Sequence, residues 1–179
     1  MPKTQQQQPD QSDEPQVITS ESAVRNLVLR RLNQRSYTRK QLEDYLARKG
    51  ADPEVVAAVL NRFAEVRLID DAEYAREFVR AKRSIKGAGP SVLRMELKKR
   101  GIEDALIDEA IDSRLGEDVD VARGLAERKL ATLGRFDSAT QMRRISGFLI
   151  RRGYSPHLAF AVTRDVVAAE SQAEERWHS

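Results

Sequence analysis

The side chains best suited to contact a partner are twelve lysines and arginines gathered in three short segments of the chain. The segments read TRKQLEDYLARKG at 38–50, GPSVLRMELKKRG at 89–101 and SATQMRRISGFLIRRG at 138–153, and together they contain three carboxylates. Such a surface attracts phosphate groups or an acidic protein groove. The twelve cations are Arg39, Lys40, Arg48, Lys49, Arg94, Lys98, Lys99, Arg100, Arg143, Arg144, Arg151 and Arg152.

Residues that could carry catalysis are sparse. The chain has no cysteine, which excludes a thiolate nucleophile and Cys-type zinc or iron–sulfur sites. It has no GxxxxGK[ST] motif, and the Gly-Ala-Gly at 87–89 is too short for a dinucleotide fingerprint. His157 and His178 are not placed as an obvious general base or metal ligand. Asp70 and Asp71 fit a helix start better than a metal site, because anions there meet the positive end of the helix dipole. We therefore expect a binding protein, not an enzyme, with no cofactor and no metal.

The basic segments are also the repeating unit of the chain. Aligned on their closing glycines, they share two aliphatic positions, held by Leu42, Leu93 and Ile145 and by Leu46, Leu97 and Leu149. The glycines Gly50, Gly101 and Gly153 lie 51 and 52 residues apart. A fixed period of this length is typical of a tandem array of small helical units.

Helical spacing of apolar residues and end signals predict helices at 21–34, 38–49, 53–66, 70–84, 90–100, 103–115, 117–133, 138–152 and 156–168, with no convincing strand. Thr38 and Ser138 each have glutamine three residues later, as in a capping box. Asp52 and Ser155 each precede a proline at the first helical position. The repeat glycines should end their helices in the left-handed conformation.

The predicted fold is all-α, with three tandem three-helix repeats stacked into an elongated, curved array. The expected divisions are a disordered N-terminal tail at 1–20, repeats at 21–69, 70–115 and 116–168, and a C-terminal tail at 169–179. No apolar run approaches the ~20 residues that span a bilayer, and the glutamine-rich start resembles neither a signal nor a transit peptide. We expect a cytoplasmic monomer without membrane contact.

The net charge of +3 conceals a segregation, because the three basic segments carry +2, +3 and +4 in chain order. The simplest alternative is a solvated face, since cations near a helix C-terminus complement its dipole. The helix dipole explains the two basic residues that precede each repeat glycine. It explains Arg143 and Arg144 less well, because they lie mid-helix in a segment without acids. We expect the basic surface to lack interleaved aromatics, so stacking on nucleic-acid bases is not indicated.

Three stretches resemble the RecX family of regulatory proteins. They are VRLIDDAEYAREFVRAK at 66–82, KGAGPSVLRMELKKRGI at 86–102 and FLIRRGYS at 148–155, in family order within roughly 21–168. Arg67 departs from the pattern, because the family commonly has glycine before its Leu-Ile-Asp-Asp. As a hypothesis, that segment is structural and joins repeats one and two through Leu68, Ile69, Asp70, Asp71, Tyr74 and Phe78.

The resemblance implies a modulator of the RecA recombinase. Family members bind the RecA filament on single-stranded DNA, lodge in its helical groove and mainly inhibit its recombinase and ATPase activities. The family has no catalytic motif to carry over, and we expect the basic second helices to face the filament. Direct contact with single-stranded DNA stays open. The alternative is a helical-repeat protein that binds DNA directly and without sequence preference.

Overall fold

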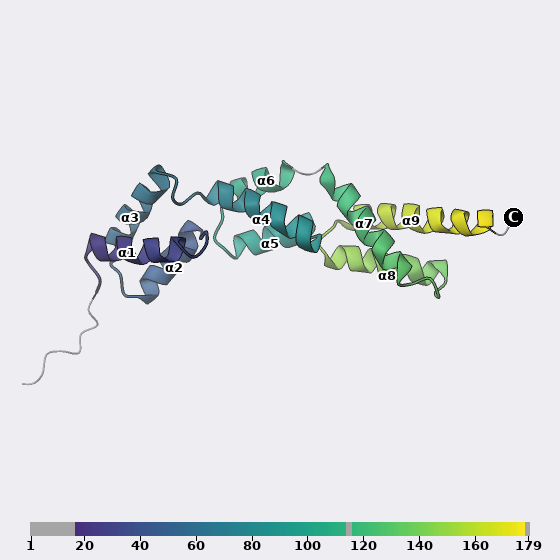
Figure 1. Ribbon diagram of the computed structural model, residues 1–179, viewed down its shortest axis with the longest axis horizontal. Coiled ribbons are helices and arrows are strands. Elements are labelled where there is room, and N and C mark those ends of the chain that lie inside the picture. Colours follow the sequence, from purple (N-terminus) through teal and green to yellow (C-terminus); the bar gives the residue numbers. More distant parts are fainter. Residues whose placement is uncertain (1–16, 114–115, 178–179) are drawn as a thin grey trace, which may run out of the picture. The chain divides into compact units, whose positions relative to one another are not determined.

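The computed structural model describes residues 17–113 and 116–177, and over these residues it contains nine α-helices and one isolated bridge between Ile18 and Ala51. The helices, shown in Figure 1, are α1 (Glu21–Leu32), α2 (Arg39–Arg48), α3 (Pro53–Glu65), α4 (Asp71–Lys86), α5 (Pro90–Lys98), α6 (Asp104–Asp112), α7 (Glu117–Ala131), α8 (Ser138–Arg151) and α9 (Pro156–Trp177). The prediction of an all-α fold of tandem three-helix repeats is confirmed.

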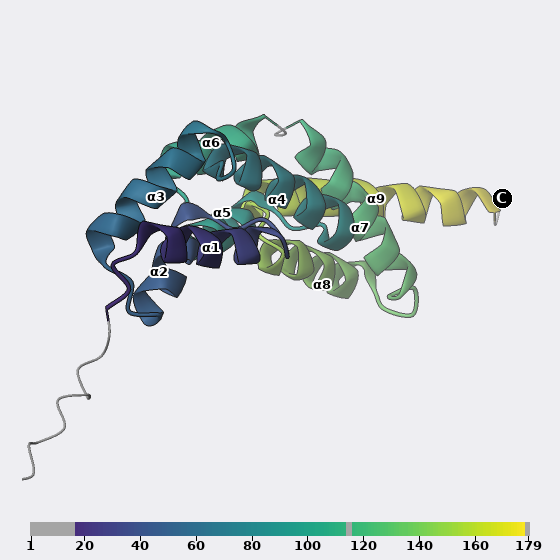
Figure 2. The same ribbon diagram turned by 60° about the vertical axis from the view of Figure 1, so that its left-hand side comes forward.

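Each repeat packs around its own core. The helices contact one another within α1–α3, α4–α6 and α7–α9, and three separate clusters of buried side chains match these groups. All six aliphatic residues at the two shared repeat positions are fully buried. In the third repeat α7 crosses α8 and α9, which run side by side (Figures 1 and 2). The chain divides into one compact unit that ends at Ile69 and a second that begins at Asp70.

The helix ends follow the predicted signals, with one correction. Thr38 forms the complete capping box with Gln41, and Asp52 accepts hydrogen bonds from two backbone amides of α3. In α8, however, the cap is Asp137 and not Ser138. Its carboxylate accepts from the amide and the hydroxyl of Thr140, both at 2.9 Å, which holds the pKa of Asp137 below its usual value. An aspartate one residue earlier makes two bonds where the serine could make one.

The repeat glycines end their helices as predicted. Gly50, Gly101 and Gly153 have φ of 72°, 77° and 99°, a region that side chains with a Cβ rarely adopt. The predicted ends of α1, α4, α5 and α7 each differ from the observed ends by two residues. The large error is in α9, which runs on to Trp177, well beyond residue 168.

Two residues of the predicted N-terminal tail belong to the first repeat. The amide of Ile18 donates to the carbonyl of Gly50 at 2.8 Å, and its carbonyl accepts from the amide of Asp52 at 3.0 Å. Ser20 is the N-cap of α1. The rest of that predicted tail, up to residue 16, lies outside the described residues.

The Leu-Ile-Asp-Asp segment contributes to both units. Ile69 is buried in the core of the first repeat, and Asp70 caps α4 by accepting from the amide of Glu73 at 2.8 Å. Tyr74 and Phe78 pack against the core of the second repeat. Each of these side chains therefore stabilises its own repeat, while Leu68 is exposed.

Arg67 adopts a conformation that suits glycine. Its φ is 55°, in the left-handed region where a Cβ costs about 1–2 kcal/mol. The change Arg67→Gly should therefore raise the free energy of unfolding by up to about 1 kcal/mol, since the greater freedom of the unfolded chain offsets part of the gain. Urea denaturation of the variant measures this effect. Arg67→Ala is the control, because it removes the charge and keeps the strain. A lower stability for Arg67→Gly would contradict the assignment of strain to this residue.

Candidate interaction surface

The four predicted cations of the first repeat divide into two that form ion pairs and two that form none among the described residues. Arg39 Nε lies 2.9 Å from Glu43 Oε1, and Lys40 Nζ lies 2.7 Å from Asp44 Oδ1, a hydrogen bond that raises the pKa of Lys40. Arg48 and Lys49 are exposed and have no ion-pair partner among the residues that the structure describes. The positive charge available to a partner therefore lies at the C-terminal end of α2.

In the second repeat the acidic third helix neutralises much of the basic second helix. Arg94 pairs with Asp108, and Lys98 Nζ lies 2.9 Å from Asp104 Oδ1. Arg100, just after the end of α5, forms a third pair with Glu96 at 3.5 Å. Exposed pairs of this kind add little stability, but each occupies a cation that a partner would otherwise meet. Lys99 alone among the four predicted cations of this repeat has no ion pair in the described part of the chain.

The second helix of the third repeat has no acid at all, from Ser138 to Arg151. Arg143 and Arg151 are exposed and make no ion pair within the described ranges. The guanidinium of Arg144 lies 4.1 Å from the ring centroid of Phe136, and that of Arg152 lies 4.9 Å from Phe148. Cations stacked on rings keep their full charge and a fixed orientation. The third repeat therefore has the largest uncompensated positive charge of the three second helices.

Aromatic rings do lie beside the basic residues, which the sequence analysis did not anticipate. Besides Phe136 and Phe148, the ring of Phe78 lies 4.4 Å from the guanidinium of Arg100, and that of Tyr45 lies 4.3 Å from Arg31. The rings of Phe136 and Phe78 come from a neighbouring loop and helix, so spacing within one segment could not reveal their contacts. Phe148, by contrast, lies four residues before Arg152 in the same segment, and that spacing was an available signal. Phe136, Phe148 and Phe78 also pack against the cores, and their role in holding arginines is evident from these distances.

Arg152 belongs to a joint between the second and third repeats, inside the second unit. Its guanidinium donates to the carbonyl of Lys86, and its own carbonyl accepts from the amide of Gly89 at 2.7 Å. The amide and hydroxyl of Ser91 donate to the carbonyl of Gly153 at 3.1 and 2.9 Å. A Cβ at Gly89 would lie 2.5 Å from the carbonyl carbon of Gly153, so this approach requires glycine. Arg152 thus has a structural role that the repeat pattern did not show.

A buried ion pair lies in the same joint. Arg83 Nη2 of α4 is 2.9 Å from Asp118 Oδ1 of α7, and the two side chains are 2% and 7% exposed. Burial raises the pKa of Asp118, and the guanidinium of Arg83 opposes that rise. The hydroxyl of Tyr154 donates to the carbonyl of Gly87 at 3.3 Å, and burial raises the pKa of Tyr154 to about 12. The tyrosine therefore keeps its proton near neutral pH.

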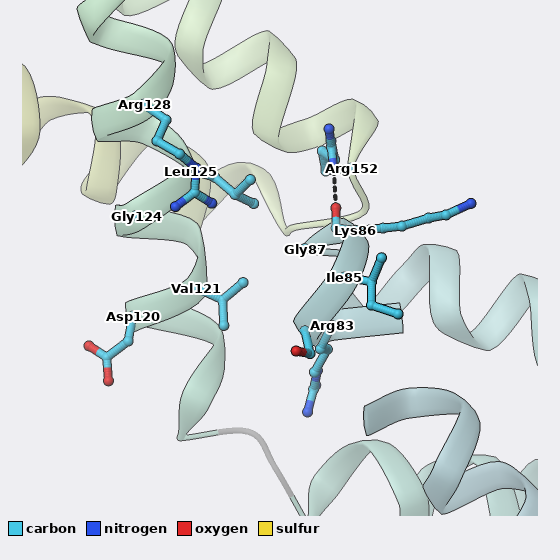
Figure 3. A pocket seen from close by; sticks show the side chains of 11 residues that line it. Arg83, Ile85, Lys86, Gly87, Asp120, Val121, Gly124, Leu125, Arg128 and Arg152 are labelled. Atoms are coloured by element: carbon cyan, nitrogen blue, oxygen red, sulfur yellow. Dashed lines mark hydrogen bonds between the residues drawn. The ribbon is translucent and has the colours of Figure 1, made fainter. Parts of the chain in front are cut away.

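A cleft of about 450 Å³ opens beside the joint, between the end of α4 and the side of α7 that faces it (Figure 3). Lys86, Asp120, Arg128 and Arg152 are among the residues that line it, and the amino group of Lys86 points away from α7 (Figure 3). The sequence analysis included Arg152 but missed Lys86 and Arg128, because they lie outside the basic segments. The two consecutive basic residues Arg128 and Lys129 were a sequence signal that could have indicated this cleft.

Two further kinds of site were considered in the described residues, a metal site and a membrane-spanning helix. Among them no three or more His, Asp or Glu side chains gather as they would around a metal ion. Nor does any helix within this part of the chain have the length and apolar character needed to span a membrane. His157 is exposed in the first turn of α9, and His178 lies outside the described residues.

Family models match the three repeats in order. The models described as the first, second and third three-helix domains of RecX match residues 25–63, 70–111 and 116–163. Each match coincides with one group of three helices and one hydrophobic core.

Individual relatives support the same family. The chain is 36% identical over 148 residues to a protein of Thermobifida fusca named regulatory protein RecX, covering 82% of this chain and 80% of the relative. It is 37% identical over 167 residues to the protein of that name from Mycobacterium avium, covering 92% and 94%. The crystal structure of RecX from Lactobacillus salivarius has a TM-score of 0.77 at 24% identity, over 82% of this chain and 96% of that one, and so shares the fold. The chain belongs to the RecX family of regulatory proteins.

Proposed function

We propose that this protein binds the RecA filament assembled on single-stranded DNA and mainly inhibits its recombinase and ATPase activities. The observation that carries the proposal is the match of all three RecX repeats in order. The protein acts by binding, as a cytoplasmic monomer, and performs no chemistry of its own. The twelve cations of the second helices are the proposed contact surface, with the dominant share in α8 because its charge is uncompensated.

The cations of the proposed contact surface are not equally neutralised by neighbouring carboxylates. The cations of α5 are largely paired with acids of α6, whereas Arg143, Arg144 and Arg151 meet no carboxylate in the residues described. Charge free of intramolecular partners attracts an acidic partner without first breaking a pair. Arg48, Lys49 and Lys99 would add weaker contacts in the other two repeats, and several weak contacts on one filament reinforce one another.

Titration into RecA on single-stranded DNA with ATP tests the proposal. ATP hydrolysis and strand exchange should fall with added protein and reach a plateau at saturation. Unchanged hydrolysis and strand exchange at saturating protein would refute it. The same titration on RecA without DNA is the control, because the proposed target is the filament.

Direct, nonspecific DNA binding is the second candidate, favoured by the arginine–phenylalanine contacts at Phe136 and Phe148. Its signature is tight binding to bare DNA that weakens steeply with salt and needs no RecA. Binding of bare single-stranded DNA at the affinity seen for the filament would favour this candidate over the first.

A further inference from the structure

A glycine lies in the middle of α8, on the side away from the core. Gly147 is half-buried and helical, and glycine inside a helix is destabilising relative to alanine. A Cβ placed there would meet only the terminal Nη1 of Arg151, at 3.4 Å, which is the end of a flexible side chain. Packing within the described part of the protein therefore gives no reason for glycine at this position. A close approach by another molecule would give such a reason, because glycine lets a neighbouring surface come near the helix backbone.

The neighbours of Gly147 show what kind of molecule fits. Residues three and four positions apart share a helix face, so Arg143, Arg144, Ile150 and Arg151 surround the glycine. The three arginines are exposed, and Ile150 is 38% exposed. The face thus combines a bare stretch of backbone, an accessible isoleucine and a rim of positive charge.

Ile150 extends this face into an apolar cleft. The cleft has a volume of about 590 Å³ and lies between the starts of α7 and α9 and the end of α8. Val119, which is 41% exposed, lines it together with Tyr154, Pro156 and Leu158. A cleft of this size can hold a large apolar side chain of a partner.

We propose that the outer face of α8 is a docking surface for an acidic protein segment, which crosses the helix at Gly147 and places an apolar side chain against Ile150 in the cleft. Its carboxylates pair with Arg143, Arg144 and Arg151. The inference rests on the proposed function, so the segment belongs to a protomer of the filament. An apolar centre surrounded by a charged rim is the usual arrangement of residues in a protein–protein interface.

A nucleic-acid backbone suits this face less well. The peptide groups in the middle of a helix are already hydrogen-bonded, so Gly147 offers C–H surface and no free N–H donor for a phosphate. The apolar cleft next to it would stay empty beside a phosphodiester chain. A peptide segment uses both features, together with the arginines.

Substitution of Gly147 tests the docking surface. Gly147→Ala should raise the melting temperature, because alanine favours the helix, and yet weaken binding to the filament by about tenfold, because the methyl group separates the two surfaces. Gly147→Gln should weaken binding further. Opposite changes in stability and affinity would not arise from a purely structural role. The assay is binding to preformed RecA filament on labelled single-stranded DNA.

Gly124→Ala in α7 is the matched control. Gly124 is also helical, and its added Cβ would likewise meet only an arginine four residues later, Nη1 of Arg128 at 3.5 Å. Gly124 lines the other cleft, beside Arg128, and lies outside the proposed docking surface, so this variant should gain stability and keep wild-type affinity. Ile150→Ala should also lose affinity, because it removes an apolar contact from the cleft.

The outcomes separate the two proposals. Filament binding by the wild type that persists in Gly147→Ala and Gly147→Gln overturns the docking surface and leaves the proposed function standing. A wild type that does not bind the filament overturns both. An equal loss of affinity for bare single-stranded DNA in Gly147→Ala would show that a nucleic acid occupies this face, and would overturn the assignment to a protein segment.

Discussion

Replacement of Arg143 and Arg151 by glutamate should weaken inhibition of RecA at least about tenfold, measured as the concentration that halves ATP hydrolysis. Both arginines are exposed on an acid-free helix and have no ion pair within the described residues, so their reversal breaks no internal contact of that kind. Against an acidic partner the change converts two attractions into two repulsions. The loss should shrink as salt is added, because exposed charges are screened.

A matched variant separates the local effect from net charge. Arg30→Glu/Arg164→Glu changes the net charge by the same amount on exposed residues of α1 and α9, and should inhibit nearly as well as the wild type. Far-ultraviolet circular dichroism should show unchanged helix content in both variants. Full inhibition by Arg143→Glu/Arg151→Glu would contradict the assignment of the interface to α8.

The sequence predicted the fold well because the signals for it are local. Capping side chains such as Thr38 and Asp52 act within three residues, and a left-handed glycine ends a helix whatever surrounds it. The repeat added a second constraint, since leucines recurring at equivalent positions must occupy equivalent cores. The boundary of α9 was missed because residues 169–177 contain no stop signal, and their polar character was mistaken for a tail.

The candidate surface was predictable only in part. The twelve cations and their helices follow from the repeat, but their ion pairs depend on which sides of α5 and α6 meet. Lys98 with Asp104 and Arg94 with Asp108 form across that contact. The role of Arg152 was hidden for a similar reason, because its partner carbonyl at Lys86 lies 66 residues away. A contact between two repeats does not change the sequence period of either repeat, so the repeat pattern does not reveal it.

The second large effect that we expect is on stability, and it comes from the buried ion pair of Arg83 and Asp118. Both side chains are almost completely buried where α4 meets α7, so neither charge can turn to water if the other is removed. Loss of one member of such a pair typically costs about 3–5 kcal/mol, because the remaining charge stays buried without compensation. Replacement of both members by apolar residues is often neutral, since it also removes the desolvation penalty of each charge.

Arg83→Met should therefore lower the free energy of unfolding at pH 7 by about 3 kcal/mol, and Arg83→Met/Asp118→Leu should recover most of the loss. The single variant should also depend on pH. Burial already raises the pKa of Asp118, and loss of the guanidinium raises it further. The folded state then binds a proton more readily than the unfolded state, whose aspartate has a pKa of about 3.9. The stability of Arg83→Met relative to the wild type should thus recover as the pH falls from 7 toward 4.

Urea denaturation at pH 7, 5.5 and 4 would measure this recovery, with Arg83→Met/Asp118→Asn as the control that cannot titrate at residue 118. The deficit of Arg83→Met should narrow as the pH falls, whereas the deficit of the control should stay constant. A deficit of Arg83→Met that is equally large at every pH would mean that the arginine acts through packing. In that case the side chain of Arg83, and not its charge, would stabilise the joint between the second and third repeats.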